Sequence, residues 1–171
     1  MRITIVRHAF AGHKGDFGGP DEGRMLDVTG ERDAENLVAA LTQRPIERLV
    51  SSPTTRCIQT LGPLAEAIDL PIELWDGLGP DADFSNLVDC FTNPSFSKAV
   101  LCTHGEVMSP LLRTAAFRSL VRETGLDGHA LLAKGTAWQL HLTPKGKLFG
   151  FKHVVPIMPP SPNRSGRRVS K

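Results

Sequence analysis

The chain has 171 residues, enough for one ordinary domain with a sizeable core and too few for two typical domains. Its 20 lysine and arginine residues nearly balance its 18 aspartate and glutamate residues, and the formal net charge is +2. This balance argues against general nucleic-acid binding, so any anionic ligand has to be met by a local group of cations.

The cysteines and the N-terminus exclude other classes of protein. Cys57, Cys90 and Cys102 are odd in number, far apart and without a Cys-x-x-Cys spacing. This pattern argues against a disulfide framework and a cysteine zinc site, and it favours reduced thiols in a cytoplasmic protein. The apolar run at the N-terminus is broken by Arg7 and His8, and no later segment is long enough to cross a bilayer, so we expect neither a signal peptide nor a membrane span.

Apolar periodicity predicts a regular alternation of strands and helices. In chain order, by residue number, we expect a strand at 3–6, an exposed loop at 11–27, a helix from 29 to about 45, a strand at 48–50, a helix from 54 or 55 through 68, a strand at 72–75, a loop at 77–83, a helix at 84–91, a strand at 99–102, a long helix from 105 to about 124, and two strands at 136–142 and 148–155. Four repeats of strand, loop and helix predict a mostly parallel sheet with helices on both faces.

The predicted fold class is α/β, a three-layer α/β/α sandwich with a mostly parallel central sheet and a C-terminal β-hairpin. We expect this domain to span residues 1–156. Residues 157–171 are rich in proline, serine, arginine and lysine, which predicts a flexible tail. The basic residues of this tail could contact nucleic acid or an acidic partner, but a solvated, disordered end is the simpler interpretation.

Polar side chains follow three of the predicted parallel strands. These residues are Arg7 and His8 after the first strand, Ser51, Ser52 and Arg56 after the second, and His104 after the strand at 99–102. Ligands of open α/β sheets collect at the carboxyl ends of the strands, so we expect these side chains to converge. Guanidinium groups hold phosphate oxygens in pairs, and a neutral imidazole is a competent nucleophile. The group therefore predicts a phosphoryl-transfer site.

Three motifs resemble those of the histidine phosphatase superfamily, branch 1, the phosphoglycerate-mutase-like phosphatases. They are Arg7-His8-Ala9 for Arg-His-Gly, Ser52-Pro-Thr-Thr-Arg56-Cys-Ile-Gln-Thr60 for Ser-x-x-x-Arg-x-x-x-Thr, and His104-Gly105 at the end of a strand. The resemblance covers residues 1 to about 155. It implies that His8 is the nucleophile, that Arg7, Arg56 and His104 bind the phosphoryl oxygens, and that a phosphohistidine forms and is hydrolysed without a metal or cofactor.

Two positions depart from the family pattern. Ala9 replaces the usual glycine and adds one methyl group where the backbone approaches phosphate. Many members also carry a glutamate after the third strand that protonates the leaving group, whereas Leu78-Gly-Pro80 has proline there. Asp81 and Asp83 are nearby candidates for this proton donor, with Asp83 preferred because it resembles an aspartate position of the SixA-like subgroup. Both could equally be solvated loop carboxylates or a cap for the next helix.

A missing acid favours substrates whose leaving group departs easily, such as a phosphohistidine protein or a nucleotide polyphosphate. Two subgroups with such substrates are the most similar to this sequence: the SixA phosphohistidine phosphatases, which have a small cap or none, and the phosphatase domain appended to some MutT-type Nudix hydrolases. No Nudix box is present in the sequence. The resemblance therefore implies a phosphatase of phosphorylated small molecules or phosphoproteins.

Several further residues are candidates for substrate binding. Ala9 and Ser52 belong to the motifs, and His13, Lys14 and Arg24 lie in the loop after the nucleophile, where they could extend the anion site. Ordinary solvated loop residues, and turn chemistry at Ser52, are the alternative interpretations.

Two rival functions follow from the same residues. His104-Gly-Glu106 superficially resembles a zinc deaminase motif, but the Pro-Cys-x-x-Cys partner is lacking, and a metal site is not expected. A non-catalytic phosphate-binding or phosphoprotein-binding module on the same fold is the alternative function, since a lost proton donor could mark lost catalysis.

Overall fold

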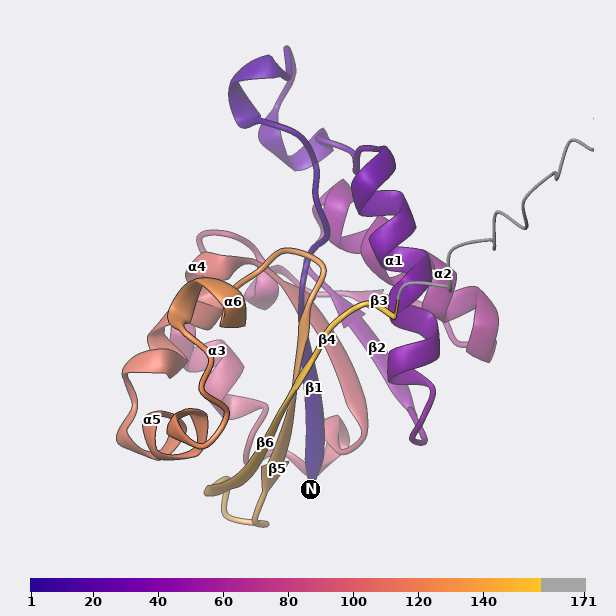
Figure 1. The fold of residues 1–171 in the computed structure, drawn as a ribbon. Coiled ribbons are helices and arrows are strands. Elements are labelled where there is room, and N and C mark those ends of the chain that lie inside the picture. Colours follow the sequence, from indigo (N-terminus) through magenta and orange to yellow (C-terminus); the bar gives the residue numbers. More distant parts are fainter. Residues whose placement is uncertain (158–171) are drawn as a thin grey trace, which may run out of the picture.

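Six strands form one sheet in the order β3-β2-β4-β1-β5-β6 in the computed structural model, which describes residues 1–157 (Figure 1). The strands are β1 Arg2–Arg7, β2 Arg48–Ser51, β3 Ile72–Leu74, β4 Ala99–Thr103, β5 Ala137–Leu142 and β6 Leu148–Val154. The pairs β1–β4, β4–β2 and β2–β3 are parallel, whereas β5 pairs antiparallel with both β1 and β6. The predicted mostly parallel sheet with a C-terminal hairpin is confirmed.

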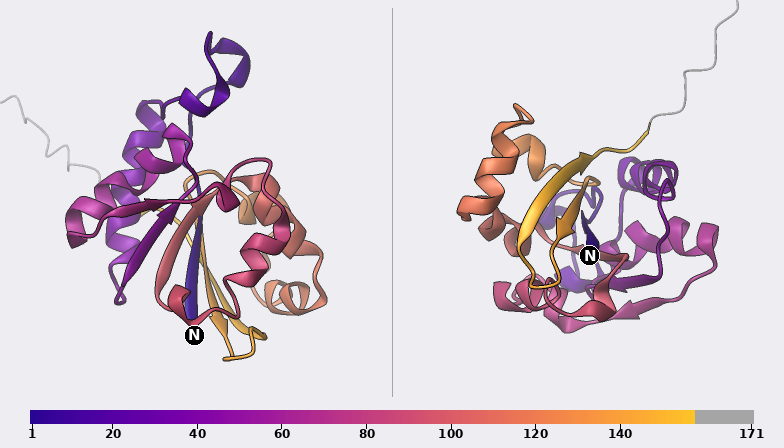
Figure 2. Two further views of the ribbon diagram at one scale, coloured as in Figure 1. Left: turned by 180° about the vertical axis from the view of Figure 1, so that it is seen from behind. Right: turned by 90° about the horizontal axis from the view of Figure 1, so that it is seen from below.

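Helices cover both faces of the sheet, as its mainly apolar central strands require. They are α1 Val28–Leu41, α2 Thr55–Ile68, α3 Phe84–Asp89, α4 Gly105–Met108, α5 Ala115–Arg122 and α6 Gly128–Leu131. Neighbouring residues of β1 point to opposite faces. Ile5 belongs to the same core cluster as Phe117 of α5, whereas Val6 belongs to that of Leu37 in α1 and Leu61 in α2. Figure 2 shows the sheet lying between these two groups of helices, so the predicted three layers are present.

The long helix expected from residue 105 to about 124 was wrong. The chain forms the short helix α4, a 3-10 turn at Ser109–Arg113 and then α5. Pro110 has no backbone N–H to continue the helix. Thr114 then adopts an extended conformation, with ψ of 141°, and its hydroxyl accepts a hydrogen bond from the N–H of Phe117 at 3.3 Å. This N-cap starts helix α5. The short helix α6, which follows it, was not predicted.

The loop between β1 and α1 rises above the carboxyl edge of the sheet (Figure 1). It contains 3-10 turns at Lys14–Asp16 and Asp21–Gly23. Its return to the body of the protein depends on Gly30, because a Cβ atom there would lie 2.0 Å from the carbonyl oxygen of Phe10. This close contact sets the position of the loop relative to the end of β1.

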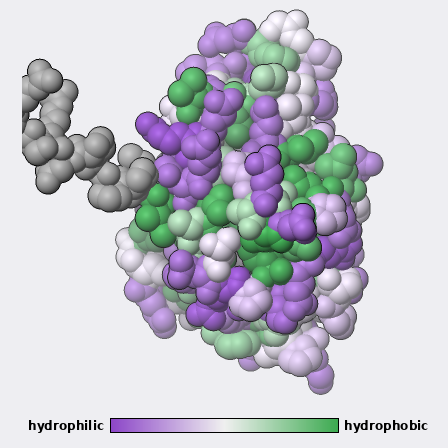
Figure 3. All heavy atoms as spheres, turned by 90° about the vertical axis from the view of Figure 1, so that its right-hand side faces the viewer, coloured by the Kyte–Doolittle hydropathy of each residue, from purple (hydrophilic) through white to green (hydrophobic). Residues whose placement is uncertain are grey.

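The described chain ends at Ile157, whose N–H donates to the carbonyl of Asn36 at 3.2 Å. The predicted tail at 157–171 otherwise lies outside the described residues. Within residues 1–157, no helix is long and apolar enough to cross a membrane. On the side that carries α1 and α2, hydrophobic groups are interspersed with hydrophilic side chains (Figure 3).

Candidate active site

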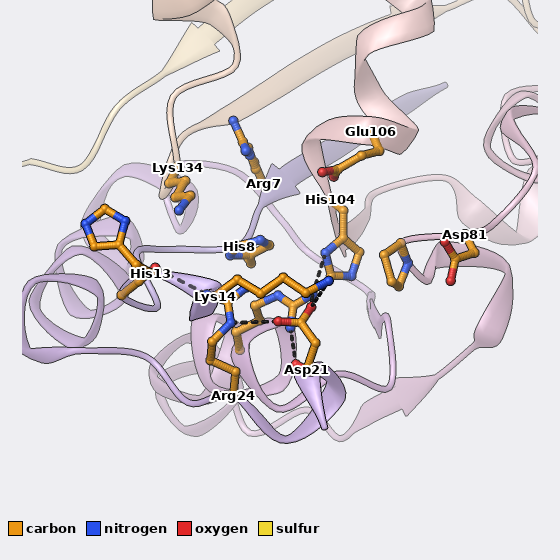
Figure 4. A pocket seen from close by; sticks show the side chains of 13 residues that line it. Arg7, His8, His13, Lys14, Asp21, Arg24, Asp81, His104, Glu106 and Lys134 are labelled. Carbon is orange, nitrogen blue, oxygen red and sulfur yellow. Dashed lines mark hydrogen bonds and ion pairs between the residues drawn. The ribbon is translucent and has the colours of Figure 1, made fainter. Parts of the chain in front are cut away.

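The carboxyl ends of β1, β2 and β4 meet at a cavity of about 400 Å³ (Figure 4). It is lined by Arg7, His8, Gly12, His13, Lys14, Asp21, Arg24, Arg56, Pro80, Asp81, His104, Glu106 and Lys134. The parallel pairs β1–β4 and β2–β4 bring together residues that are 96 and 51 positions apart in the sequence, respectively. The predicted group of Arg7, His8, Arg56 and His104 is therefore assembled in one pocket.

His8 is buried, and one nitrogen of its ring has a defined partner. Its Nδ1 lies 2.8 Å from the carbonyl oxygen of Ala9, which can only accept, so Nδ1 carries the proton and Nε2 has the free lone pair. Burial lowers the pKa of His8 to about 3. The hydrogen bond to Ala9 opposes this shift, and the electrostatic effects of His104, Arg56 and Arg7 add to it. The imidazole is thus neutral at physiological pH, as a nitrogen nucleophile must be.

Ala9 is fully buried and is absent from the pocket wall. Its carbonyl holds His8, while its N–H donates to Oγ1 of Thr60 at 2.9 Å. The Thr60 hydroxyl donates in turn to the carbonyl of Arg56 at 2.7 Å. The backbone of Ala9 therefore orients the His8 ring and links the first motif to the second, and its methyl group belongs to a buried cluster with Ala11, Leu26 and Ala34.

The guanidinium of Arg7 is packed between two backbone segments. Nη1 donates to the carbonyl of Leu132, and the buried Nε has no hydrogen-bond partner. A Cβ atom at Gly105 would lie 2.7 Å from Cζ of Arg7, so only glycine leaves room for this side chain. Burial lowers the pKa of Arg7, and the Glu106 carboxylate opposes that shift. Arg7 lines the pocket, so its guanidinium group contributes positive charge to the cavity wall.

Asp21 holds the second arginine, an interaction that the sequence interpretation missed. Nη1 of Arg56 donates to the Asp21 carbonyl at 2.6 Å, and Nη2 lies 3.1 Å from the Asp21 carboxylate. Arg24 also donates to this carboxylate, at 2.8 Å. Burial alone would raise the pKa of Asp21, but the bond from Arg24 and the charge of Arg56 outweigh it and lower the pKa. Nε of Arg56 is buried without a partner.

His104 caps the start of α4 and faces His8, with 5.1 Å between the ring centroids. Its Nδ1 lies 3.4 Å from Nη2 of Arg56, which can only donate. Nε2 of His104 consequently carries the proton and donates to Oγ of Ser52 at 3.0 Å. Ser52 is fully buried and does not line the pocket, so it contacts His104 and not the cavity.

The loop residues expected to bind substrate do reach the pocket, with different roles. Arg24 is largely buried and donates to the carbonyl of Ala11 at 2.8 Å, so this bond connects the end of the loop with its beginning. Lys14 is mostly exposed and lies 3.9 Å from the Asp21 carboxylate. His13 lines the wall on the side of the pocket opposite Asp81 (Figure 4).

Of the two expected proton donors, Asp81 lies at the pocket, whereas the preferred Asp83 does not. The Asp83 carboxylate accepts a bond from the N–H of Ser85 at 2.7 Å, caps α3 and is not part of the pocket wall. Asp81 does line the pocket, and so does Glu106, which was not considered as a proton donor. Its position two residues after His104 was the signal that could have identified it.

No group of three or more histidine, cysteine or acidic residues within residues 1–157 could hold a metal ion. The cysteines are free and buried. Metal independence stays a prediction to be tested with the protein in solution.

The family model described as histidine phosphatase superfamily (branch 1) matches residues 3–80, which include the first two motifs. The chain is thus similar to this superfamily over its N-terminal part. It is 30% identical to an 8-oxo-(d)GTP phosphatase of Mycolicibacterium smegmatis over 161 residues, which are 90% of this chain and 48% of that protein. The chain thus spans about half the length of this relative.

Solved structures of SixA proteins share the fold of this chain. The protein histidine phosphatase SixA complexed with tungstate matches with a TM-score of 0.66 and 22% identity, over 91% of this chain and 97% of that one. A SixA protein of Agrobacterium tumefaciens matches with a TM-score of 0.65 and 21% identity, over 81% of this chain and 90% of that one. The predicted resemblance to SixA-like proteins is confirmed at the level of the fold.

Proposed function

We propose that this protein is a metal-independent phosphatase in which Nε2 of His8 takes the phosphoryl group. The observation that carries the proposal is the state of His8: its Nδ1 proton is committed to Ala9, and the neutral ring lines a pocket with two arginines. The guanidinium groups of Arg7 and Arg56, which line this pocket, would donate to the phosphoryl oxygens.

The proposed reaction has two in-line steps. Nε2 of His8 attacks phosphorus, and the bond to the leaving group breaks with its electron pair on the departing atom. The ring becomes cationic, and the carbonyl of Ala9 stabilises its Nδ1 proton. Arg7 and Arg56 stabilise the charge on the equatorial oxygens. Water then attacks the phosphohistidine and releases phosphate and the free imidazole.

The proposed substrates are those with good leaving groups, a phosphohistidine protein or a nucleotide polyphosphate. Pro80 lines the pocket where family members carry an acid, and Asp81 and Glu106 are the carboxyl groups of the wall that could donate a proton. The relatives agree with this range, since they are named protein histidine phosphatase and 8-oxo-(d)GTP phosphatase. In enzyme classes, this is a phosphoric ester or phosphoramidate hydrolase.

Turnover of p-nitrophenyl phosphate and phosphoramidate tests the proposal. We expect the wild type to keep its activity in the presence of EDTA. His8→Ala should lose activity by at least about a thousandfold. The control His129→Ala, whose side chain is exposed on α6, should be as active as the wild type. Labelled phosphate should be trapped on His8 after a quench that avoids acid. Strict dependence on a divalent metal would refute the mechanism. Binding of phosphate without turnover would favour the alternative, a non-catalytic binding module.

A further inference from the structure

Lys134 has no role in the motifs, yet it lines the pocket beside the nucleophile. It precedes Gly135, whose φ is +71° and whose N–H lies 3.2 Å from the carbonyl oxygens of both Arg7 and His8. The turn before β5 is therefore bound to the end of β1, which holds Lys134 at a constant place relative to His8. Figure 4 shows its side chain beside Arg7 and His8 at the cavity.

The surroundings of Lys134 are those of a cation that lacks its anion. Burial lowers the pKa of its ammonium group, and the charges of Arg7, Arg24 and Arg56 lower it further, while the more distant charge of Asp27 only partly opposes the shift. Nζ lies 4.3 Å from the centre of the Phe10 ring, and no carboxylate within residues 1–157 forms an ion pair with it. An ammonium group held among guanidinium groups is unfavourable in the free protein and becomes favourable when an anion binds.

The other flanking cations are already engaged. Asp21 accepts bonds from Arg24 and Arg56 and lies within ion-pair distance of Lys14. Within residues 1–157, Lys134 and Arg7 are the cations of the pocket wall that form no ion pair with a carboxylate, and Arg7 already donates to the carbonyl of Leu132. The cavity of about 400 Å³ also leaves room beyond one phosphoryl group.

We infer that Lys134 forms a second anion subsite, which binds the phosphate adjoining the transferred phosphoryl group in a nucleoside diphosphate or triphosphate. This inference rests on the proposed function and narrows its substrate class to phosphoanhydrides. When the P–O bond to the leaving phosphate breaks, the electron pair remains on the bridging oxygen, and the nearby ammonium group stabilises that charge. Charge stabilisation by Lys134 thereby compensates for the acid that Pro80 replaces.

The test compares substrates with and without the second phosphate. We expect Lys134→Met to lower kcat/KM for ADP about tenfold more than for p-nitrophenyl phosphate, and Lys134→Arg to keep most of the preference. Lys145→Met is the matched control, since Lys145 is exposed in the turn between β5 and β6, and it should change neither value. The thermal midpoint of each variant shows whether it has folded.

A second measurement does not depend on turnover. In His8→Ala, inorganic pyrophosphate should bind more tightly than phosphate by calorimetry, and adding Lys134→Met should remove that preference.

Two results would overturn the subsite: an equal loss of kcat/KM for ADP and p-nitrophenyl phosphate in Lys134→Met, or a preference for pyrophosphate that Lys134→Met leaves unchanged. A selective loss for 3-phosphoglycerate without one for ADP would also overturn it, because the second anion would then be a carboxylate. If the wild type hydrolyses neither substrate but still prefers pyrophosphate through Lys134, the proposed function fails and the subsite stands.

Discussion

His8 combines burial with a single defined hydrogen bond, and both affect its charge. Removal from water penalises the imidazolium form, while the Ala9 carbonyl partly favours it, and the pKa falls to about 3. The unfolded chain has a histidine pKa of about 6.5. Between these two values the unfolded state binds more protons than the folded state, so His8 makes the protein less stable as the pH falls.

This linkage predicts a difference between wild type and His8→Ala in their response to pH. Lowering the pH from 7 to 5 should cost the wild type about 2 kcal/mol more free energy of unfolding than it costs the variant. Urea unfolding at both pH values measures the difference. His141 and His153, whose pKa values are also lowered by burial, are present in both proteins and cancel. Equal pH responses would mean that His8 is not buried in the neutral form.

At the scale of elements, glycine has opposite roles in two helices. Gly105 is the first residue of α4, and its missing Cβ leaves room for Arg7. Gly62 lies inside α2, where a Cβ atom would meet nothing within 4 Å. Replacing each glycine with alanine therefore distinguishes the effect of a contact with Arg7 from the effect of helix propensity alone.

We expect Gly105→Ala to displace the Arg7 guanidinium and to lower kcat/KM by about tenfold or more, because a bound arginine–phosphate pair is worth roughly 1.5–3 kcal/mol. Gly62→Ala should leave activity unchanged and raise the stability of the protein by about 0.5–1 kcal/mol. Steady-state kinetics and thermal unfolding of the two variants give the comparison. Full activity in Gly105→Ala would show that the position of Arg7 tolerates a Cβ atom there.

For the whole molecule, an aromatic cluster connects α5 to the sheet. The ring of Phe117 lies 4.8 Å from those of both Trp138 in β5 and Phe151 in β6, measured between centroids. Phe117 and Trp138 are fully buried. The packing of these rings holds the helical layer that follows β4 against the antiparallel end of the sheet.

Phe117→Ala should lower the free energy of unfolding by about 3–5 kcal/mol, because it removes a buried ring and leaves a cavity. Phe149→Ala is the control: this side chain is 60% exposed on β6, and its loss should change stability by less than about 0.5 kcal/mol. Urea unfolding at neutral pH measures both. A small effect of Phe117→Ala would mean that α5 contributes little to the cooperative fold.

Local patterns were sufficient to predict most of the elements. The β-branched run before Arg7 and the apolar strand before His104 each end where the polar residues begin, and parallel pairing then requires both to lie at one edge. Apolar spacing likewise predicted α1 and α2 to within a few residues. The break between α4 and α5 was missed because apolar spacing continues across Pro110, although the capping residue Thr114 was visible.

Sequence patterns predicted the fold class and the two histidines and two arginines of the pocket, since strand ends and motif spacing are local properties. What these residues contact depends on the tertiary structure. The partner of Arg56 lies 35 residues away at Asp21, and that of Arg7 lies 125 residues away at Leu132. Lys134 reaches the pocket through a turn that no motif marks. Such contacts depend on how the layers pack, and apolar periodicity carries no information about pairings over that distance.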